Sequence, residues 1–503
     1  MSAARPTESL NTALTASLVS RIWVAAIAVL SVPVYLRFMG IEAIGVVGVF
    51  TSLSALVGVL DLGMGATLTR ELARLSGEPA QLPQARDTTR TLEIAYAGIA
   101  LLIALLLIAL SGQIARHWVQ AASLSVESVG RAIALSGVAL AGQWPGNLYA
   151  SGLAGLHRQS ALGAMTAFMA TLRVAITVLA LWREPSIEQF FLAQVIAGLL
   201  HTIGLRWLLW RALALPGRRP RWDPAMVSGS LRFAGGMTGI TLTSLLITQT
   251  DKLILSRALS LSEFGVYSLA TAVTSGLYML ISPVFSVLYP RLTALVHAGD
   301  ERALAELYLT GSQAMALLVL PVAAVIACFS TDVLLAWTGD AALSRSGAWV
   351  LTLLVVGNAG NGLMNLPFAL QLANGWTRLA LWVNIVSLPL LVPAIWLAAT
   401  QYGAVGGAAV WAGFSLCLVV AIPQIMHRHL LPGSRNAWYR TGVALPVAVC
   451  GGLMTVAALL HDATASRAGL ALQLALWWAL ASLATALCLP RLRARLRVYI
   501  GRQ

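Results

Sequence analysis

Long apolar stretches alternate with short polar ones along the whole chain. A stretch near 20 apolar residues predicts a helix that crosses a hydrocarbon core about 30 Å thick, because backbone groups in lipid must be paired within the segment. The pattern therefore predicts an all-α integral membrane protein with fourteen transmembrane helices. The predicted spans are Leu18–Leu36, Ile44–Leu60, Ile94–Ile114, Ala132–Leu153, Leu162–Trp182, Phe190–Leu209, Phe233–Leu255, Phe264–Leu288, Ala314–Phe329, Ala348–Leu372, Leu379–Ala399, Tyr402–Met426, Val443–Leu460 and Leu470–Leu489.

The composition agrees with a membrane protein. Of the 503 residues, 58% are apolar and 10% are charged, and the mean hydropathy is +0.80. An ordinary soluble domain is about 25% charged, so the excess apolar surface must face lipid. The four cysteines lie inside apolar stretches without metal-type spacing, and we expect neither a metal, a disulfide nor a cofactor.

The basic residues predict the topology. The chain has 33 basic and 19 acidic residues, a net charge of +14, and its basic residues lie between the apolar stretches. This distribution favours anionic lipid headgroups as partners and not nucleic acid. Alternating the sides after each span puts 24 Lys and Arg inside and 8 outside, which predicts that both termini are cytoplasmic. The first span contains Arg21 and no small-residue cleavage site, so we expect it to be retained.

An internal repeat predicts two lobes. A shift of 220 residues pairs Arg37 with Arg257 and Gly45 with Gly265, and it superposes predicted helix on predicted helix. We expect parallel six-helix lobes at 1–220 and 221–440, with two additional helices and a basic tail at 441–503 and a cleft between the lobes. Leucines at helical spacing predict a short interfacial helix after each lobe's second span. They are Leu68, Leu72 and Leu75 in the first copy and Leu292, Leu295, Leu304 and Leu307 in the second.

Charges within the spans are the candidate functional residues. Arg173 lies ten residues from Arg183, about 15 Å along the helix, and so near the predicted midplane. Either its side chain serves a cavity, or it has a structural role, in which it snorkels to one interface or binds the free carbonyls of a broken helix. Arg21 lies about one turn inside the cytoplasmic boundary of the first span, where a functional role and simple snorkelling to the interface are the alternatives. Arg37 and Arg257 lie at the outer ends of the first and seventh spans, where a cationic mouth and simple anchoring are the alternatives. His201 is interpreted as a hydrogen-bonded core histidine.

Acidic residues follow a different pattern. Asp251 and Lys252 lie near the outer end of the seventh span, as either a local ion pair or a gate or coupling site, and Asp61 is a second candidate. Asp61, Glu93 and Asp332 fall at predicted helix ends, and none is near a midplane. A carboxylate relay for protons or sodium is therefore not predicted. A deep fixed cation instead favours an anionic substrate, and Arg binds phosphate oxygens in a bidentate manner.

Four segments resemble a known family. They are Leu60–Arg74 (LDLGMGATLTRELAR), Thr250–Ala270 (TDKLILSRALSLSEFGVYSLA), Leu370–Ile385 (LQLANGWTRLALWVNI) and Tyr402–Trp411 (YGAVGGAAVW). These segments are similar to bacterial polysaccharide-transport proteins of the Wzx type, in the superfamily that also holds multidrug extrusion antiporters and lipid II flippases. Members of this type line a central cleft with cationic residues. Arg21 matches a basic residue early in the first helix, Lys252 matches the Asp-Lys pair of the seventh, and Arg173 matches no motif.

The resemblance implies a flippase of the bacterial inner membrane. Its substrate would be an undecaprenyl-diphosphate-linked oligosaccharide used for O-antigen, capsule or exopolysaccharide synthesis. The implied partners are the glycosyltransferases, polymerase and chain-length regulator of the same pathway. The chemistry is consistent, since a diphosphate and sugars lose their hydration in hydrocarbon unless a polar cleft replaces it.

Three alternatives remain. A cation-coupled drug or metabolite antiporter of the same superfamily would need a mid-span carboxylate. A membrane glycosyltransferase, polymerase or ligase would need a large outer loop with carboxylates, whereas no connection here exceeds about 35 residues, too few for a soluble catalytic domain. We therefore do not expect an enzyme. A non-transporting envelope scaffold predicts that a neutral replacement of Arg173 is silent.

Overall fold

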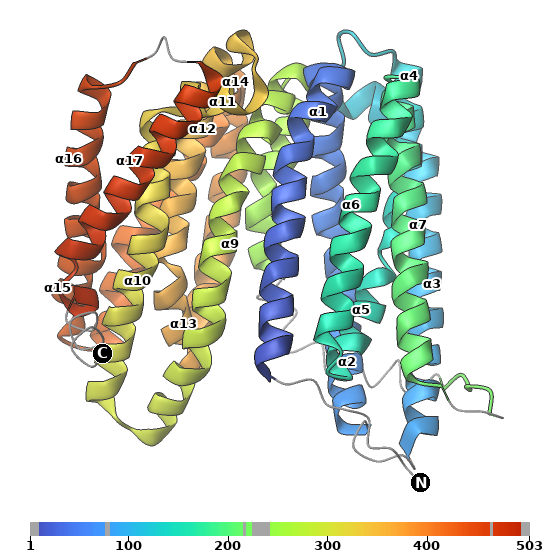
Figure 1. Ribbon diagram of the computed structural model, residues 1–503, viewed down its shortest axis with the longest axis horizontal. Coiled ribbons are helices and arrows are strands. Elements are labelled where there is room, and N and C mark those ends of the chain that lie inside the picture. The colour runs from blue at the N-terminus through green and yellow to red at the C-terminus, as the bar shows by residue number, and fades with distance from the viewer. Residues whose placement is uncertain (1–9, 76–80, 215–217, 224–241, 463–465, 494–503) are drawn as a thin grey trace. The chain divides into compact units, whose positions relative to one another are not determined.

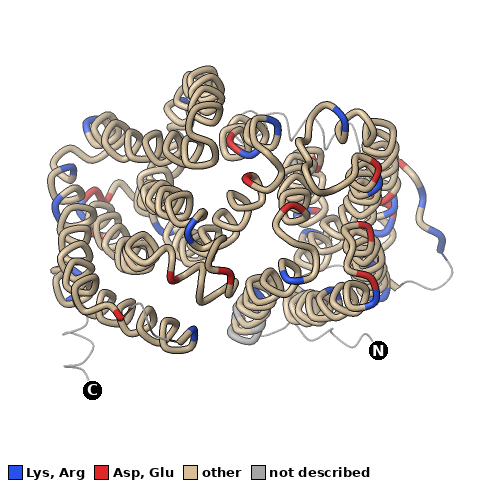
Figure 2. Tube along the Cα trace, turned by 90° about the horizontal axis from the view of Figure 1, so that it is seen from above, with Lys and Arg blue, Asp and Glu red and all other residues tan. Residues whose placement is uncertain are grey.

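Helices make up the regular structure of the computed structural model (Figure 1). It describes residues 10–75, 81–214, 218–223, 242–462 and 466–493. Within these ranges, ten helices are long and apolar enough to cross a membrane, and β-type pairing is limited to one isolated bridge between Gln120 and Ser260. Charged positions are sparse along the trace (Figure 2). The prediction of an all-α membrane protein is confirmed.

The chain divides into two compact units, Met1–Gly265 and Val266–Gln503. Within its described residues, the first unit contains nine helical elements, the helix at 242–258 and the start of the next helix. They are α1 (Leu10–Gly58), η1 (Val59–Asp61), α2 (Met64–Leu75), α3 (Leu82–Gln113), the π-helix η3 (Ile114–Trp118), α4 (Val126–Gln143), α5 (Gly146–Gly155), α6 (Gln159–Arg183), α7 (Ile187–Ala212), 242–258 and the start of α9 (Leu261–Ala298).

The second unit continues α9 and adds nine helical elements. They are α10 (Glu301–Cys328), α11 (Ser330–Thr338), α12 (Ala341–Leu363), α13 (Asn365–Ala373), α14 (Thr377–Leu430), α15 (Ser434–Ala437), the π-helix η4 (Trp438–Ala444), α16 (Leu445–Leu459) and α17 (Arg467–Cys488). Its core contains fully buried Tyr308, Met315 and Leu366. A smaller cluster joins Phe329 to Met454 and Ala481 of the final helix pair.

Several helices begin where a side chain accepts hydrogen bonds from the first free backbone N–H groups. Ser125 caps α4, Ser186 caps α7 and Ser466 caps α17. Asp300 and Asp340 do the same for α10 and α12. These caps fix the starts of the long apolar helices at short polar connections.

Two pairs of predicted spans are joined through glycine breaks. Leu18–Leu36 and Ile44–Leu60 both lie on α1, which leaves helical geometry at Gly40 (φ 78°, ψ 175°). The eleventh and twelfth predicted spans both lie on α14, which breaks at Gly403 (φ 61°, ψ −145°). Residues with a side chain disfavour positive φ. Glycine therefore lets the chain leave helical geometry at these two kinks without a separate loop. The seventh predicted span is helical at 242–258, and its first residues, from Phe233, lie outside the described residues.

The first of the two predicted short helices is present, and the second is not a separate helix among the described residues. On α2, Leu68, Leu72 and Leu75 are fully buried, whereas Arg70 and Arg74 are exposed. The prediction of a separate second copy is wrong. Leu292 and Leu295 continue α9, and Leu304 and Leu307 belong to α10, because Leu292 and Leu304 pack into the core of the second unit.

The repeat recurs in the helix boundaries. α4 ends at Gln143 and α12 ends at Leu363, 220 residues later. Next, α5 begins at Gly146 and α13 at Asn365, 219 residues later. The same mid-helix interruption therefore appears in both units. The lobe boundaries at 220 and 440 stay a prediction, while contacts place 242–258 with the first unit.

Candidate functional site

Arg173 lies among helices of the first unit. It is half-buried on α6, and its Nη2 donates to Gln143 Oε1 on α4 over 3.3 Å. Tyr35 of α1 and His201 of α7 are within electrostatic range of its guanidinium. The guanidinium therefore contacts an amide from α4 and interacts electrostatically with a phenol from α1 and an imidazole from α7.

Further polar groups extend this cluster along α6 and α7. Thr177 Oγ1 donates to the backbone oxygen of Arg173, and Gln194 Nε2 donates to Thr177 Oγ1 over 3.2 Å. Both side chains are buried. His201 Nε2 is buried and has no hydrogen-bond partner within the described ranges. The expectation of a hydrogen-bonded core histidine therefore does not hold at that atom, because its neighbour is the cationic Arg173.

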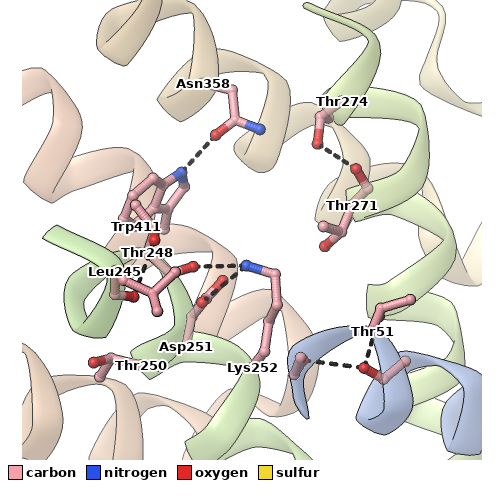
Figure 3. Close-up of polar contacts among 12 residues, drawn as sticks. Thr51, Leu245, Thr248, Thr250, Asp251, Lys252, Thr271, Thr274, Asn358 and Trp411 are labelled. Carbon is pink, nitrogen blue, oxygen red and sulfur yellow. Dashed lines mark hydrogen bonds and ion pairs between the residues drawn. The ribbon is translucent and has the colours of Figure 1, made fainter. Parts of the chain in front are cut away.

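Lys252 and Asp251 form a local ion pair. Lys252 Nζ donates to the Thr248 backbone oxygen over 2.8 Å and lies 3.3 Å from Asp251 Oδ1 (Figure 3). Both side chains are mostly buried, at 20% and 6% exposed. Of the two interpretations, the local pair is the contact present, and a gating or coupling role stays a prediction.

The two repeat-related arginines are used differently. Arg257 Nη1 donates to the His117 backbone oxygen, and its guanidinium lies 5.7 Å from the centre of the Trp118 ring. Trp118 Nε1 donates in turn to Ser256 Oγ over 3.0 Å. Arg257 thus anchors the end of the 242–258 helix. Arg37, like Arg21, is exposed on α1.

Asp61 organises the turn before α2. The Gly65 N–H donates to its Oδ1 over 3.2 Å, and Leu62 and Gly63 adopt positive φ values of 45° and 74°. Burial raises the pKa of the Asp61 carboxyl, and the N–H groups of Gly65 and Gly63 partly offset this rise. This geometry makes Asp61 a helix cap, and a gating role stays a prediction.

Glu93 corrects a sequence-based prediction. It was expected at a helix end but lies inside α3, which begins at Leu82, because the polar residues before the apolar stretch extend the same helix. Its Oε1 accepts from Arg206 Nε over 2.5 Å and from the Tyr149 hydroxyl over 2.7 Å. Its Oε2 accepts from Arg90 Nη1 over 2.8 Å. This cluster, in which the carboxylate is buried and the two arginines are about half exposed, joins α3, α5 and α7.

A buried amide was also missed in the second unit. Trp411 Nε1 of α14 donates to Asn358 Oδ1 of α12 over 2.9 Å (Figure 3). The signal was present, because Asn358 is a polar residue within the span Ala348–Leu372. Among the described residues, no group of three His, Cys, Asp or Glu side chains could hold a metal ion.

Comparison with known proteins identifies the family of this chain. The family model for "Polysaccharide biosynthesis protein" matches residues 13–296, more than half of the chain. The chain therefore belongs to the polysaccharide biosynthesis protein family. A search of curated proteins finds no significant match.

Solved structures share the fold. An inward closed conformation of the lipid II flippase MurJ has a TM-score of 0.71 at 12% identity, covering 94% of this chain and 98% of that one. An inward-facing multidrug resistance MATE family transporter of the MOP superfamily has a TM-score of 0.63 at 14% identity, covering 80% and 95%. A MOP superfamily transporter from Pyrococcus furiosus gives 0.57 at 13%, covering 86% and 97%. The predicted resemblance is confirmed for family and fold.

Proposed function

We propose that this chain is a flippase for a lipid-linked saccharide. It would move an undecaprenyl-diphosphate-linked oligosaccharide repeat unit from the cytoplasmic to the periplasmic leaflet of the bacterial inner membrane. The supporting observation is the family match together with a fold similar to a lipid II flippase over 94% of the chain. The product would serve O-antigen, capsule or exopolysaccharide synthesis.

The mechanism we propose is alternating access between two six-helix lobes in a fourteen-span chain with cytoplasmic termini. A water-filled cleft would replace the hydration that sugars and diphosphate lose, while the polyprenyl tail stays in lipid. Arg21, Arg37 and Lys252 are the proposed contacts for the diphosphate, because fixed cations attract anions strongly where the dielectric is low. Arg257 is exposed and donates through Nη1 to the His117 backbone oxygen, and it stays a further candidate for this contact.

The membrane potential would assist this transport. Where the cell interior is negative, outward movement of each net negative charge is favoured by about 2.3 kcal/mol per 100 mV. A diphosphate diester therefore gains from the potential without a mid-span carboxylate. Glycosyltransferases that build the repeat unit and a polymerase that consumes it are the expected partners, with a chain-length regulator downstream.

Deletion tests the proposal in cells. We expect a deletion strain to accumulate the lipid-linked repeat unit in the inner leaflet and to lose the corresponding surface polysaccharide. Arg21→Gln and Lys252→Gln should complement poorly, whereas Arg183→Gln, which alters an exposed arginine at the end of α6, should complement fully. Normal surface polysaccharide in the deletion strain would contradict the proposal.

A drug or metabolite antiporter is the second candidate, favoured by the likeness to a multidrug MATE transporter. It predicts that vesicles with an imposed proton or sodium gradient expel an organic cation through this protein. A flippase predicts no such efflux and does predict altered leaflet distribution of the lipid-linked saccharide. The two assays on one preparation separate the candidates.

A further inference from the structure

Arg173 has no counter-charge among the described residues. The ion pairs that the structure describes involve other residues, and its single hydrogen bond is the one to Gln143 Oε1. A guanidinium carries five N–H donors, so the other four have no acceptor among the described residues, and the side chain is half-buried. An unpaired cation among membrane helices is costly, and a bound anion would remove that cost.

The neighbouring groups are neutral donors. Tyr35 and His201 approach Arg173 from α1 and α7, and an unperturbed phenol or imidazole carries no negative charge near neutral pH. The buried Nε2 of His201 has no partner within the described ranges and can carry an N–H. The surroundings thus supply hydrogen-bond donors to an anion, and the positive charge itself comes from Arg173.

Close packing of α4 against α7 limits the space beside Gln143. Beside Arg173's partner Gln143, α4 and α7 approach each other at glycines. A Cβ added at Gly198 would lie 3.2 Å from Gln143 Cβ, and one at Gly142 would lie 3.1 Å from Leu199 Cδ2. A sugar ring does not fit between helices at this separation. Arg173 nevertheless retains accessible surface, so an ion can reach it.

We propose that the first unit binds a small inorganic anion of halide size, chloride in the cell, between α1, α4, α6 and α7. Arg173 is its principal ligand, and His201 Nε2, which has no hydrogen-bond partner among the described residues, is the further donor. The site stabilises the first unit by neutralising a cation where screening by water is weak. It goes beyond the proposed flippase function, and either proposal can fail without the other.

Thermal unfolding of the purified full-length protein in detergent tests the site. Replacing gluconate by chloride at constant ionic strength should raise the unfolding midpoint until the site saturates, because a ligand that binds the folded state stabilises it. Arg173→Gln should weaken this apparent affinity by about tenfold or more, a difference of about 1.4 kcal/mol. Arg183→Gln, ten residues along the same helix and exposed, is the matched control and should respond as the wild type does. An equal chloride response in Arg173→Gln, or no chloride response in the wild type, would overturn the proposal.

Bromide gives a readout that needs no variant. Wild-type crystals grown in bromide should show an anomalous peak within hydrogen-bonding distance of the Arg173 guanidinium. The phosphate groups of a lipid-linked substrate have related chemistry, so inorganic pyrophosphate is the competing probe. We expect pyrophosphate to leave the bromide peak in place. Displacement of bromide by pyrophosphate would assign Arg173 to phosphate and overturn the halide site, as would the absence of a peak.

Discussion

The two units share the interruption between α4 and α5 and between α12 and α13, but they differ in the polar groups of their interiors. In the first unit, Glu93 is buried with Arg90, Arg206 and Tyr149 around its carboxylate. The 220-residue shift places Gln313 at the corresponding position of the second unit, where its Oε1 accepts only the Arg491 backbone N–H among described groups. The repeat therefore keeps the helical framework in both units. Among the described residues, the buried carboxylates lie in the first unit.

Loop capping shows the same contrast. In the first unit, the buried Glu42 carboxylate accepts the backbone N–H groups of Ala122, Ser123 and Leu124 from a distant part of the chain. The shift pairs Ala122 with Ala342, whose N–H donates instead to the neighbouring Asp340. One unit fixes this corner by a tertiary contact and the other by a local cap.

Removing the tertiary cap should have the largest effect. Glu42→Ala leaves three backbone N–H groups without their acceptor, and we expect it to lower the free energy of unfolding by about 3 kcal/mol. Asp340→Ala removes an ordinary N-cap and should cost about 1 kcal/mol. Unfolding of both variants in detergent measures the difference. Equal losses would mean that the two corners are held alike.

The buried carboxylate of α3 comes next. Glu93→Leu strips the Tyr149 hydroxyl and two arginines of their shared acceptor, and we expect a loss of about 2 kcal/mol. Gln313→Leu, its counterpart, loses one hydrogen bond and should cost about 1 kcal/mol or less. The same unfolding measurement compares them. A larger loss in Gln313→Leu would reverse the contrast between the interiors.

Gly45 and Gly265 are paired by the 220-residue repeat, so alanine should destabilise the protein to a similar extent at either position. A Cβ at Gly45 would meet the Leu261 backbone oxygen, and a Cβ at Gly265 would meet that of Ile41. Gly45→Ala and Gly265→Ala should each cost about 1–2 kcal/mol, because backbone atoms cannot move aside. Gly276→Ala has open space and should be neutral or stabilising. Thermal midpoints test this, and tolerance of alanine at only one of Gly45 and Gly265 would contradict the reciprocal contact.

The smallest effect concerns α2, the short helix that has no separate counterpart in the second unit. Burial opposes ionisation of Glu71, but hydrogen bonds and charge from Arg74 and Arg70 outweigh it and lower the pKa of the carboxyl. A lowered folded-state pKa contributes stability above the ordinary value of 4.5, and this is lost as the pH falls through the folded value. Since both arginines are exposed, we expect a few tenths of a kcal/mol. Glu71→Gln should flatten this part of the stability profile measured between neutral and acid pH, and an unchanged profile would contradict the assignment.

The sequence predicted the helices better than the site. Apolar stretches locate helices because hydrocarbon leaves the backbone no other pairing, but they do not mark where a helix continues beyond the apolar stretch, as α3 does before Glu93. Lys252 and Asp251 are neighbours in sequence, so their local pairing could be anticipated. The partners of Arg173 come from three other helices, and no pattern along one helix identifies them.

Leaflet exchange in a reconstituted membrane tests the central claim most directly. Vesicles containing the purified protein and an undecaprenyl-diphosphate-linked oligosaccharide are treated with a glycosidase that reaches only the outer leaflet. We expect the protein to expose nearly all of the saccharide within minutes, faster under a potential that draws the anion outward, whereas protein-free vesicles should protect about half. Equal protection with and without the protein would contradict the account.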